Sequence, residues 1–140
     1  MDGMDWTLEV VVVPVSDVDR AKAFYSEQLG FHVDVDRRMS EHMRVVQLTP
    51  PGSGCSVVVG EGVTRAAPGA YQGLQLCVTD IEAARARLVE RGVEVDGVFH
   101  FGPNGREEGH GGPWNSFLAF SDPDGNGWVV QEAPQDRSQR

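Results

Sequence analysis

Short alternating runs of apolar and polar residues fill most of the chain, and helical spacing interrupts them twice. The first run, residues 8–15, is rich in β-branched residues and has the length of a strand. Apolar residues at i, i+3 and i+7 then predict an amphipathic helix over 16–29, with Ser16 as its N-cap and Gly30 as its C-cap. The residues that set this spacing are Val18, Ala21 and Tyr25. Three strands are predicted to follow, at about 31–38, 42–49 and 55–60.

The same order of elements restarts in the second half of the chain. Residues 74–78 have the pattern of a strand, Thr79 and Glu82 have the spacing of a capping box, and Gly92 fits a C-cap. The helical spacing itself recurs 63 residues later, at Ile81, Ala84 and Leu88. Further strands are predicted near 93–100, 115–120 and 127–132. The chain is therefore predicted to be an internal β-α-β-β-β repeat of class α+β.

The repeat defines the domain organisation. We expect one domain over 1–140, made of a first βαβββ module at 8–60 and a second at 71–132. The polar end of the chain, 135–140, is expected to fray.

A cluster of turn-forming residues, Asp122 to Asn126, lies between the last two apolar runs. Pro fixes φ, Gly supplies a positive φ, and Asp and Asn side chains bond their own backbone, so these residues predict a tight turn between two strands. Alternation then places Val129 and Gln131 on one face of the last strand. It places Trp128 and Val130 on the other face, as core that packs on a helix.

Composition excludes several classes of partner. The formal net charge of −9 disfavours nucleic acid, whose phosphates need a basic patch. No run approaches the ~20 apolar residues of a membrane helix, and the acidic N-terminal sequence lacks the basic region of a signal peptide. Cys55 and Cys77 form no disulfide framework, so we expect two buried thiols in a reducing cytoplasm.

Five stretches together resemble the vicinal oxygen chelate superfamily, the group of glyoxalases, bleomycin-resistance proteins and extradiol dioxygenases. They are Val15-Ser16-Asp17 with Ala23-Phe24-Tyr25, Leu29-Gly30-Phe31, Val78-Thr79-Asp80, and Asp122-Pro123-Asp124-Gly125-Asn126. The resemblance covers about residues 8–132. It implies the glyoxalase/bleomycin-resistance fold, in which two tandem modules form a curved mixed-sheet cup for a small molecule. It also implies a symmetric homodimer.

Enzymes of this superfamily hold a divalent metal with His, Glu or Gln, and those positions can be compared with this chain. The first ligand of each module lies seven residues before the Asp that opens the helix, which gives Val10 and Gly73. Val129 stands where the closing Glu is usual, and the strand 56–59 offers no carboxylate or imidazole. Val and Gly carry no donor side chain, so we expect no metal and no cofactor.

Side chains that alternate onto the same strand face as the metal-ligand positions of the superfamily are predicted to line the implied cup. The candidate ligand-binding residues are Val10, Val12, Val45, Gln47, Gly73, Gln75, His100, Trp114, Phe117, Val129 and Gln131, with Cys77 and Ala119 as further candidates. This set is apolar with a few amides, which is typical of a pocket for a neutral, apolar or aromatic small molecule. The alternative is that the same residues fill a closed core. Gly73 favours a pocket because it leaves space.

Residues 101–114 form the longest predicted loop, with five glycines and aromatic residues at both ends. One hypothesis is a lid that stacks a planar ligand against Trp114, and the other is a mobile loop without a role. His110 with Glu107 and Glu108 is the one His/carboxylate cluster in the sequence, and we expect it to be a solvated part of this loop.

Two functions remain open at this point. The first is a metal-independent binding protein that sequesters a drug or secondary metabolite, as the antibiotic-resistance branch of the family does. The second is a metal-independent isomerase, cyclase or lyase in which Gln47, Gln131 or His100 assists proton transfer. The sequence shows no convincing acid/base pair on the cup face, which favours binding; catalytic residues are unassigned.

Overall fold

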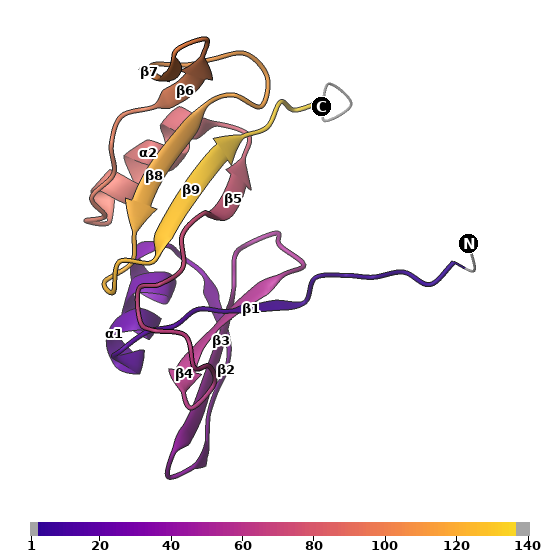
Figure 1. Cartoon of the computed structure of the whole chain (residues 1–140), viewed down its shortest axis with the longest axis vertical. Coiled ribbons are helices and arrows are strands. Elements are labelled where there is room, and N and C mark those ends of the chain that lie inside the picture. The colour runs from indigo at the N-terminus through magenta and orange to yellow at the C-terminus, as the bar shows by residue number, and fades with distance from the viewer. Residues whose placement is uncertain (1–2, 137–140) are drawn as a thin grey trace. The chain divides into compact units, whose positions relative to one another are not determined.

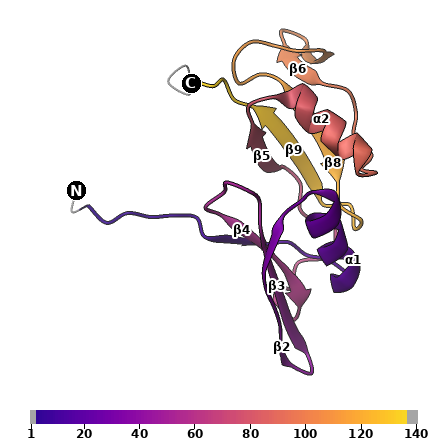
Figure 2. The ribbon, with the colours of Figure 1, turned by 180° about the vertical axis from the view of Figure 1, so that it is seen from behind.

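The computed structural model describes residues 3–136, so positions 137–140 of the tail expected to fray lie outside the described residues. The chain divides into two compact units, Met1–Pro68 (unit 1) and Gly69–Arg140 (unit 2). Each unit has a sheet with a helix on one face (Figures 1 and 2). The α+β class and the two βαβββ modules are thereby confirmed.

Unit 1 contains one mixed sheet of strand order β1-β4-β3-β2. Its elements are β1 (Val10–Val12), α1 (Val18–Ala23), the π-helical turn η1 (Phe24–Gln28), β2 (His32–Ser40), β3 (Met43–Thr49) and β4 (Ser56–Glu61). β1 pairs with β4 in parallel, and the other pairs are antiparallel.

Unit 2 repeats this topology with one added strand, in the order β5-β9-β8-β6-β7. Its elements are β5 (Leu74–Val78), α2 (Ile81–Glu90), β6 (Phe99–Gly102), β7 (Gly105–Glu108), β8 (Phe117–Ser121) and β9 (Gly127–Glu132). Again the first and last strands of the module pair in parallel.

Both helices begin one residue later than predicted. The N-caps are Asp17 and Asp80, whose carboxylates accept from the N–H of Arg20 and Ala83 at 3.0 Å, so the assignments to Ser16 and Thr79 are wrong. Ser, Thr and Asp have similar capping preferences, and the carboxylate also benefits from the helix dipole. The predicted capping box is wrong too, because the N-cap is Asp80 and the Glu82 carboxylate contacts His110 Nε2 at 2.8 Å. The predicted C-cap glycines are confirmed, both with φ near 80°.

Two boundaries differ for identifiable reasons. The first predicted strand shortens to residues 10–12, since Pro14 has no N–H to continue a ladder. The strand predicted from residue 93 begins only at Phe99, because the N–H of Val93 donates to the Leu88 carbonyl at 2.9 Å and closes α2.

The turn from Asp122 to Asn126 is a hydrogen-bonded structure whose two end residues are buried, while Pro123 and Gly125 are exposed. One Asp122 oxygen accepts from the backbone N–H of Asp124 and Asn126, both at 2.9 Å, and the other accepts from the Asn126 amide at 2.8 Å. Asn126, which is 0% exposed, also accepts from the N–H of Tyr71 at 3.1 Å. The predicted turn is confirmed, and it ties the start of unit 2 to the β8–β9 hairpin.

Each sheet buries the face that its helix covers and leaves the other face more accessible. In unit 2 the covered face contains Leu118, Phe120, Trp128 and Val130, all buried, with α2 packed on β8 and β9. This confirms that Trp128 and Val130 belong to the core. In unit 1 the covered face buries Val46, Leu48, Val57 and Val59.

Most of the predicted loop 101–114 is ordered structure, so that prediction is wrong. Its first part is a hairpin in which β6 pairs with β7, from Phe99↔Glu108 to Gly102↔Gly105. A glycine-rich sequence hides such short strands, because the ladder here depends on backbone pairing more than on apolar alternation. Within residues 3–136, no helix is long and apolar enough to cross a membrane.

Candidate functional site

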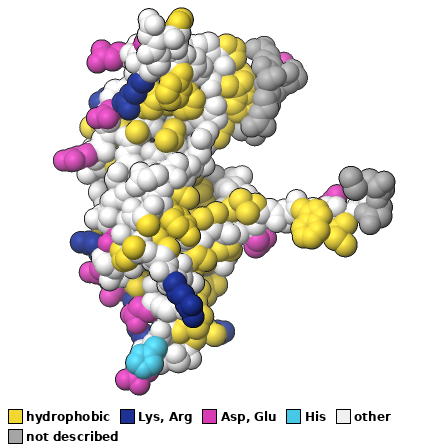
Figure 3. All heavy atoms as spheres, viewed as in Figure 1, with side chains coloured by type: hydrophobic (Ala, Val, Ile, Leu, Met, Phe, Trp, Pro, Cys, Tyr) yellow, Lys and Arg dark blue, Asp and Glu magenta, His cyan; other side chains and the backbone are white. Residues whose placement is uncertain are grey.

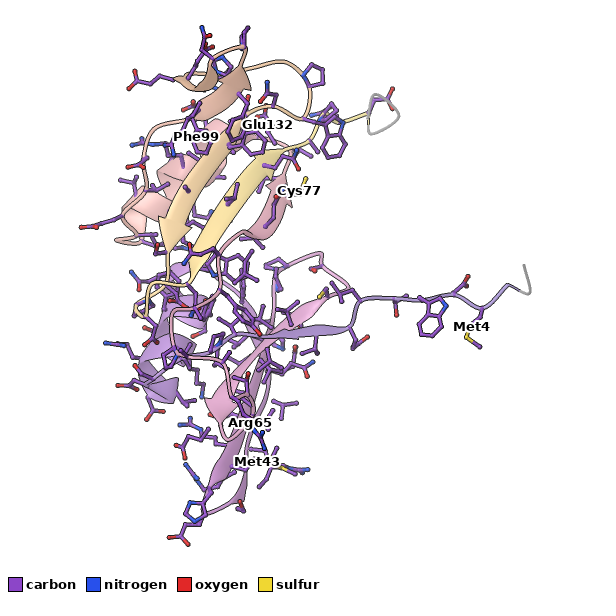
Figure 4. All side chains as sticks on the ribbon, in the orientation of Figure 1. Met4, Met43, Arg65, Cys77, Phe99 and Glu132 are labelled. Atoms are coloured by element: carbon purple, nitrogen blue, oxygen red, sulfur yellow. The ribbon has the colours of Figure 1, made fainter. Side chains whose placement is uncertain are left out.

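The uncovered face of the β5-β9-β8 sheet brings several predicted site residues together. Register places Gln75 beside Val129 and Val129 beside Ala119, and in the next row it places Cys77 beside Gln131 and Gln131 beside Phe117. All six side chains are exposed or half-buried in unit 2. We call these residues the open face of unit 2: Gln75, Cys77, Phe117, Ala119, Val129 and Gln131. Figure 1 looks onto this face, with Cys77 labelled on its β5 edge in Figure 4.

The two glutamines of the open face are hydrogen-bonded to each other and to a carbonyl. Gln75 Nε2 donates to Gln131 Oε1 at 2.7 Å, and Gln131 Nε2 donates to the backbone oxygen of Trp114 at 2.8 Å. Trp114 has φ 64°, and it is the one non-glycine residue among 3–136 with a positive φ. Such a conformation costs roughly 1–3 kcal/mol and persists where surrounding contacts impose it. The Gln131 amide supplies one of these contacts.

Three phenylalanines border the open face at its β6 side. The rings of Phe99, Phe101 and Phe117 contact one another, with centroid separations of 5.4–5.8 Å. The guanidinium of Arg106 lies 3.7 Å from the centre of the Phe99 ring, a cation–π contact. Phe101 remains 55% exposed and offers a ring to a bound molecule. Phe99 and Arg106 were not among the predicted site residues, although the Phe-His-Phe alternation at 99–101 is a signal for two rings on one face.

His100 lies apart from the open face. Alternation along β6 directs it away from Phe99 and Phe101. Its Nδ1 is 2.8 Å from the Gly109 carbonyl, and its Nε2 is 3.1 Å from a Glu107 carboxylate oxygen. The ring therefore holds the β6–β7 hairpin. His110 is exposed, as expected for a solvated loop residue, and its Nε2 lies 2.8 Å from Glu82 of α2.

The remaining predicted residues lie at two other places. In unit 1, Val12, Val58 and Gln47 are neighbours in register, and Val45 pairs with Gly60, so the unit 1 candidates share the sheet face that α1 leaves uncovered. In unit 2, Gly73 directly precedes β5. A Cβ there would meet nothing within 4 Å, which agrees with the predicted space, but its φ of 81° also requires glycine for the backbone.

An open depression of about 750 Å³ lies at the Gly73 end of the unit 2 sheet. It is lined by Ala119 and Val129 of the open face, Phe120 and Trp128 of the helix-covered face, and Glu94 and Asp96 from the segment after α2. Its volume lies within the range of small-molecule sites.

The two cysteines are more accessible than predicted. Cys77 is exposed on β5 and Cys55 is half-buried, and neither forms a disulfide within the described chain, so the expectation of two buried thiols is wrong. Burial was assumed from residue type, whereas the strand parity that placed Cys77 on the open face is the better guide.

The sequence profile of the Glyoxalase/Bleomycin resistance protein/Dioxygenase superfamily matches residues 7–130. This chain belongs to that superfamily.

The chain is similar to proteins of solved structure and, in sequence, to a further bacterial protein. TnmS3, an antibiotic binding protein from Streptomyces sp. CB03234, is 36% identical and has a TM-score of 0.74, over 92% of this chain and 97% of TnmS3. A superfamily protein from Sphaerobacter thermophilus DSM 20745 is 31% identical with a TM-score of 0.72, over 91% of this chain and 98% of that one. The uncharacterized protein YetH of Bacillus subtilis (strain 168) is 26% identical over 123 residues, 87% of this chain and 94% of YetH.

This chain differs from the metal-binding enzymes of the superfamily at the positions where those enzymes have their metal ligands. Val10, Gly73 and Val129 supply no oxygen or nitrogen side-chain donor, so these residues do not fit a divalent metal. Across residues 3–136, no group of three His, Cys, Asp or Glu side chains is arranged to hold one.

Proposed function

We propose that this protein binds a neutral small molecule, a drug or secondary metabolite, on the open face of unit 2 without a metal and without converting it. The observation that carries this proposal is the character of the face, where Phe117, Ala119 and Val129 surround two hydrogen-bonded amides. Apolar walls with a few fixed polar groups are what such ligands require. The similarity to TnmS3, an antibiotic binding protein, supports the same class of function.

The chemistry of the face also supports binding over conversion. Its polar groups are the Gln75 and Gln131 amides, which do not transfer protons near neutral pH, and the Cys77 thiol. His100, a candidate for proton transfer, has both ring nitrogens engaged with Gly109 and Glu107. The second candidate function, a metal-independent isomerase, cyclase or lyase, is favoured by one observation, the exposed Cys77 thiol beside Gln131.

We also propose that the protein is a homodimer of the reducing cytoplasm. Residues 3–9 precede β1 as an extended arm, neither helix nor strand, that runs away from the unit 1 sheet (Figure 1). Met4, Trp6 and Leu8 alternate with polar residues and are 67%, 87% and 71% exposed. Hydrophobic side chains gather along this arm in Figure 3, and Figure 4 labels Met4 near its end.

The apolar side of the arm continues the alternation of β1, whose Val10 and Val12 are half-buried. β1 is also an edge strand of the unit 1 sheet, with a backbone available for pairing. An amphipathic extended segment that continues an edge strand fits a second copy of the chain, because a symmetric pair buries both apolar sides at once.

The ligand proposal is tested with a thermal-shift screen of antibiotics and aromatic metabolites, followed by equilibrium dialysis and mass spectrometry of each hit. A ligand at 100 times its Kd adds about 2.7 kcal/mol to stability. We expect saturable binding with unchanged mass and isomer composition, lost in Val129→Arg and retained in Val89→Arg, which carries the same change on the exposed side of α2. Turnover of a hit would favour the enzyme. Binding that survives Val129→Arg would contradict the assigned face.

A further inference from the structure

We propose that Gln75 recognises a hydrogen-bond donor on the ligand, a hydroxyl, phenol or N–H group, and that Gln131 fixes the orientation that makes this possible. This inference rests on the proposed binding function and names the chemistry of its polar contact. It follows from a chain of three groups whose donor and acceptor roles leave a single consistent arrangement.

The chain begins at the backbone oxygen of Trp114, which can only accept. Its position is fixed by the next residue, Asn115, whose side chain exchanges two hydrogen bonds with the backbone of Phe101, accepting from its N–H and donating to its carbonyl, both at 2.9 Å. Ser116 adds a third contact through its hydroxyl, which accepts from the Gly111 N–H at 3.1 Å. The Trp114 carbonyl is therefore anchored to the β6 strand and the loop.

Gln131 must present its NH₂ group to this carbonyl. An amide can be rotated by 180° with little change in shape, but the flipped form would bring two oxygens to 2.8 Å. With Nε2 committed to Trp114, the Oε1 atom of Gln131 faces Gln75. The separation of 2.7 Å there requires a donor, so the nearer atom of Gln75 is Nε2. The Trp114 carbonyl thus sets the orientation of the Gln131 amide directly, and through Gln131 it sets the orientation of the Gln75 amide.

The consequence is that Gln75 directs its carbonyl oxygen away from Gln131. Gln75 is exposed on β5, and no described residue donates to this oxygen, so both of its lone pairs remain available. Gln131, in contrast, already uses its oxygen and one of its N–H groups. On a face whose other members are Val129, Ala119 and Phe117, an oriented acceptor selects ligands that carry a donor.

A pair of probes that differ in this donor and in one methyl group tests the inference: 2-naphthol and its methyl ether, 2-methoxynaphthalene. Each is titrated into the uniformly ¹⁵N-labelled full chain, and Kd is measured from backbone amide shifts. One added hydrogen bond predicts that 2-naphthol binds about 3- to 10-fold more tightly. Gln75→Met should remove this preference, so that in this variant the Kd values of the two probes lie within twofold of each other. Gln131→Met should reduce the preference, because Gln75 is then able to flip.

Gln135→Met is the matched control, the same change at an exposed position beyond β9, and the preference should persist in it. If Gln131→Met does not fold, the Gln75→Met result decides alone, since that position is exposed. Equal affinity for the two probes in the native chain, or an unchanged preference in Gln75→Met, would overturn the inference and leave the binding function standing. If neither probe binds saturably, both the inference and the proposed binding function are overturned.

Discussion

The two units share one topology but place their polar side chains on different faces of their sheets. In unit 1 a charged network lies between the sheet and α1: Asp36 of β2 accepts from Arg44 of β3 at 2.9 and 3.0 Å and from Lys22 of α1 at 2.8 Å, and Arg44 also donates to Asp19 of α1 at 2.9 Å. Unit 2 concentrates amides and aromatic rings on its open face. A duplicated module therefore does not imply a duplicated site, because function depends on the side chains that each copy presents.

The last hairpin of each unit shows the same divergence. The β3–β4 turn, residues 50–55, is mostly exposed, and the bonds of Ser53 stay within it, to Cys55 through its hydroxyl and to the Pro50 carbonyl through its N–H. The β8–β9 turn is buried at its two end residues, Asp122 and Asn126, and Asn126 bonds to Tyr71 at the start of the unit. The turn of unit 2 thus connects β8 and β9 to the segment before β5. Gly73 and the 750 Å³ depression lie at this end of the sheet.

The largest expected effect comes from the buried turn. Asn126→Ala removes the acceptor for the Tyr71 N–H and the donor to Asp122, and leaves both partners buried. We expect a loss of about 3 kcal/mol in the free energy of unfolding, measured by urea denaturation. Ser53→Ala in the exposed turn of unit 1 should cost less than about 0.5 kcal/mol. Similar losses from the two substitutions would refute the contrast between the turns.

A smaller effect is expected from the N-terminal arm, which has no counterpart before β5. Trp6→Glu places a charge on the apolar side of the arm and should weaken a homodimer by about 2 kcal/mol, or roughly 30-fold in the dimer Kd. Sedimentation equilibrium measures this. Thr7→Glu places the same charge on the polar side and should leave the dimer intact. A native chain that is monomeric at high concentration contradicts the proposal at once.

The repeat, the turn and the helix ends were predictable because each depends on residues with special local chemistry. A positive φ at the end of a helix selects glycine, which is why Gly30 and Gly92 marked those ends correctly. Asp122 to Asn126 are five consecutive turn-forming residues of four types, Asp, Pro, Gly and Asn. The N-caps were missed by one residue, because Ser16 and Asp17 are both good caps and only the extended φ of −134° at Asp17 distinguishes them.

The site was predictable in part. Strand parity correctly placed Gln75, Phe117, Val129 and Gln131 on one face, because side chains alternate along any strand. The hydrogen bond between Gln75 and Gln131 could not be predicted from the sequence. Gln75 lies directly opposite Val129, and it reaches Gln131 only as a diagonal neighbour on the adjacent strand. The position of His100 was also hidden, because it depends on the short β6–β7 hairpin.

The contribution of each unit to ligand binding can be compared by shortening an apolar side chain on the uncovered face of each sheet. Phe101→Ala in unit 2 removes an exposed ring beside Phe117 and should weaken binding of 2-naphthol by about 1 kcal/mol, or fivefold. Val12→Ala on the uncovered face of unit 1 should change the affinity less than Phe101→Ala does. The exposed Val89 of α2 provides the control, since Val89→Ala should have no effect. A larger loss from Val12→Ala than from Phe101→Ala would contradict the assignment of the ligand to unit 2.

The smallest effect concerns the charged network of unit 1. Hydrogen bonds from Arg44 and then Lys22 hold the pKa of Asp36 well below its ordinary value. A carboxyl with a depressed pKa in the folded state stabilises the protein above its unfolded pKa of about 3.9, and this contribution is lost as the pH falls through the folded pKa. Asp36→Asn should therefore cost about 1 kcal/mol at pH 7, with the difference from the native chain shrinking below pH 4.

Asp96→Asn is the matched change in unit 2, where the carboxylate lies 3.5 Å from Arg106 and both side chains are at least half exposed. Water screens such a pair, so denaturation at pH 7 should show no measurable loss. An Asp36→Asn variant whose deficit stays constant from pH 7 to pH 2 would show that the network acts through packing, and the electrostatic distinction between the units would then fail.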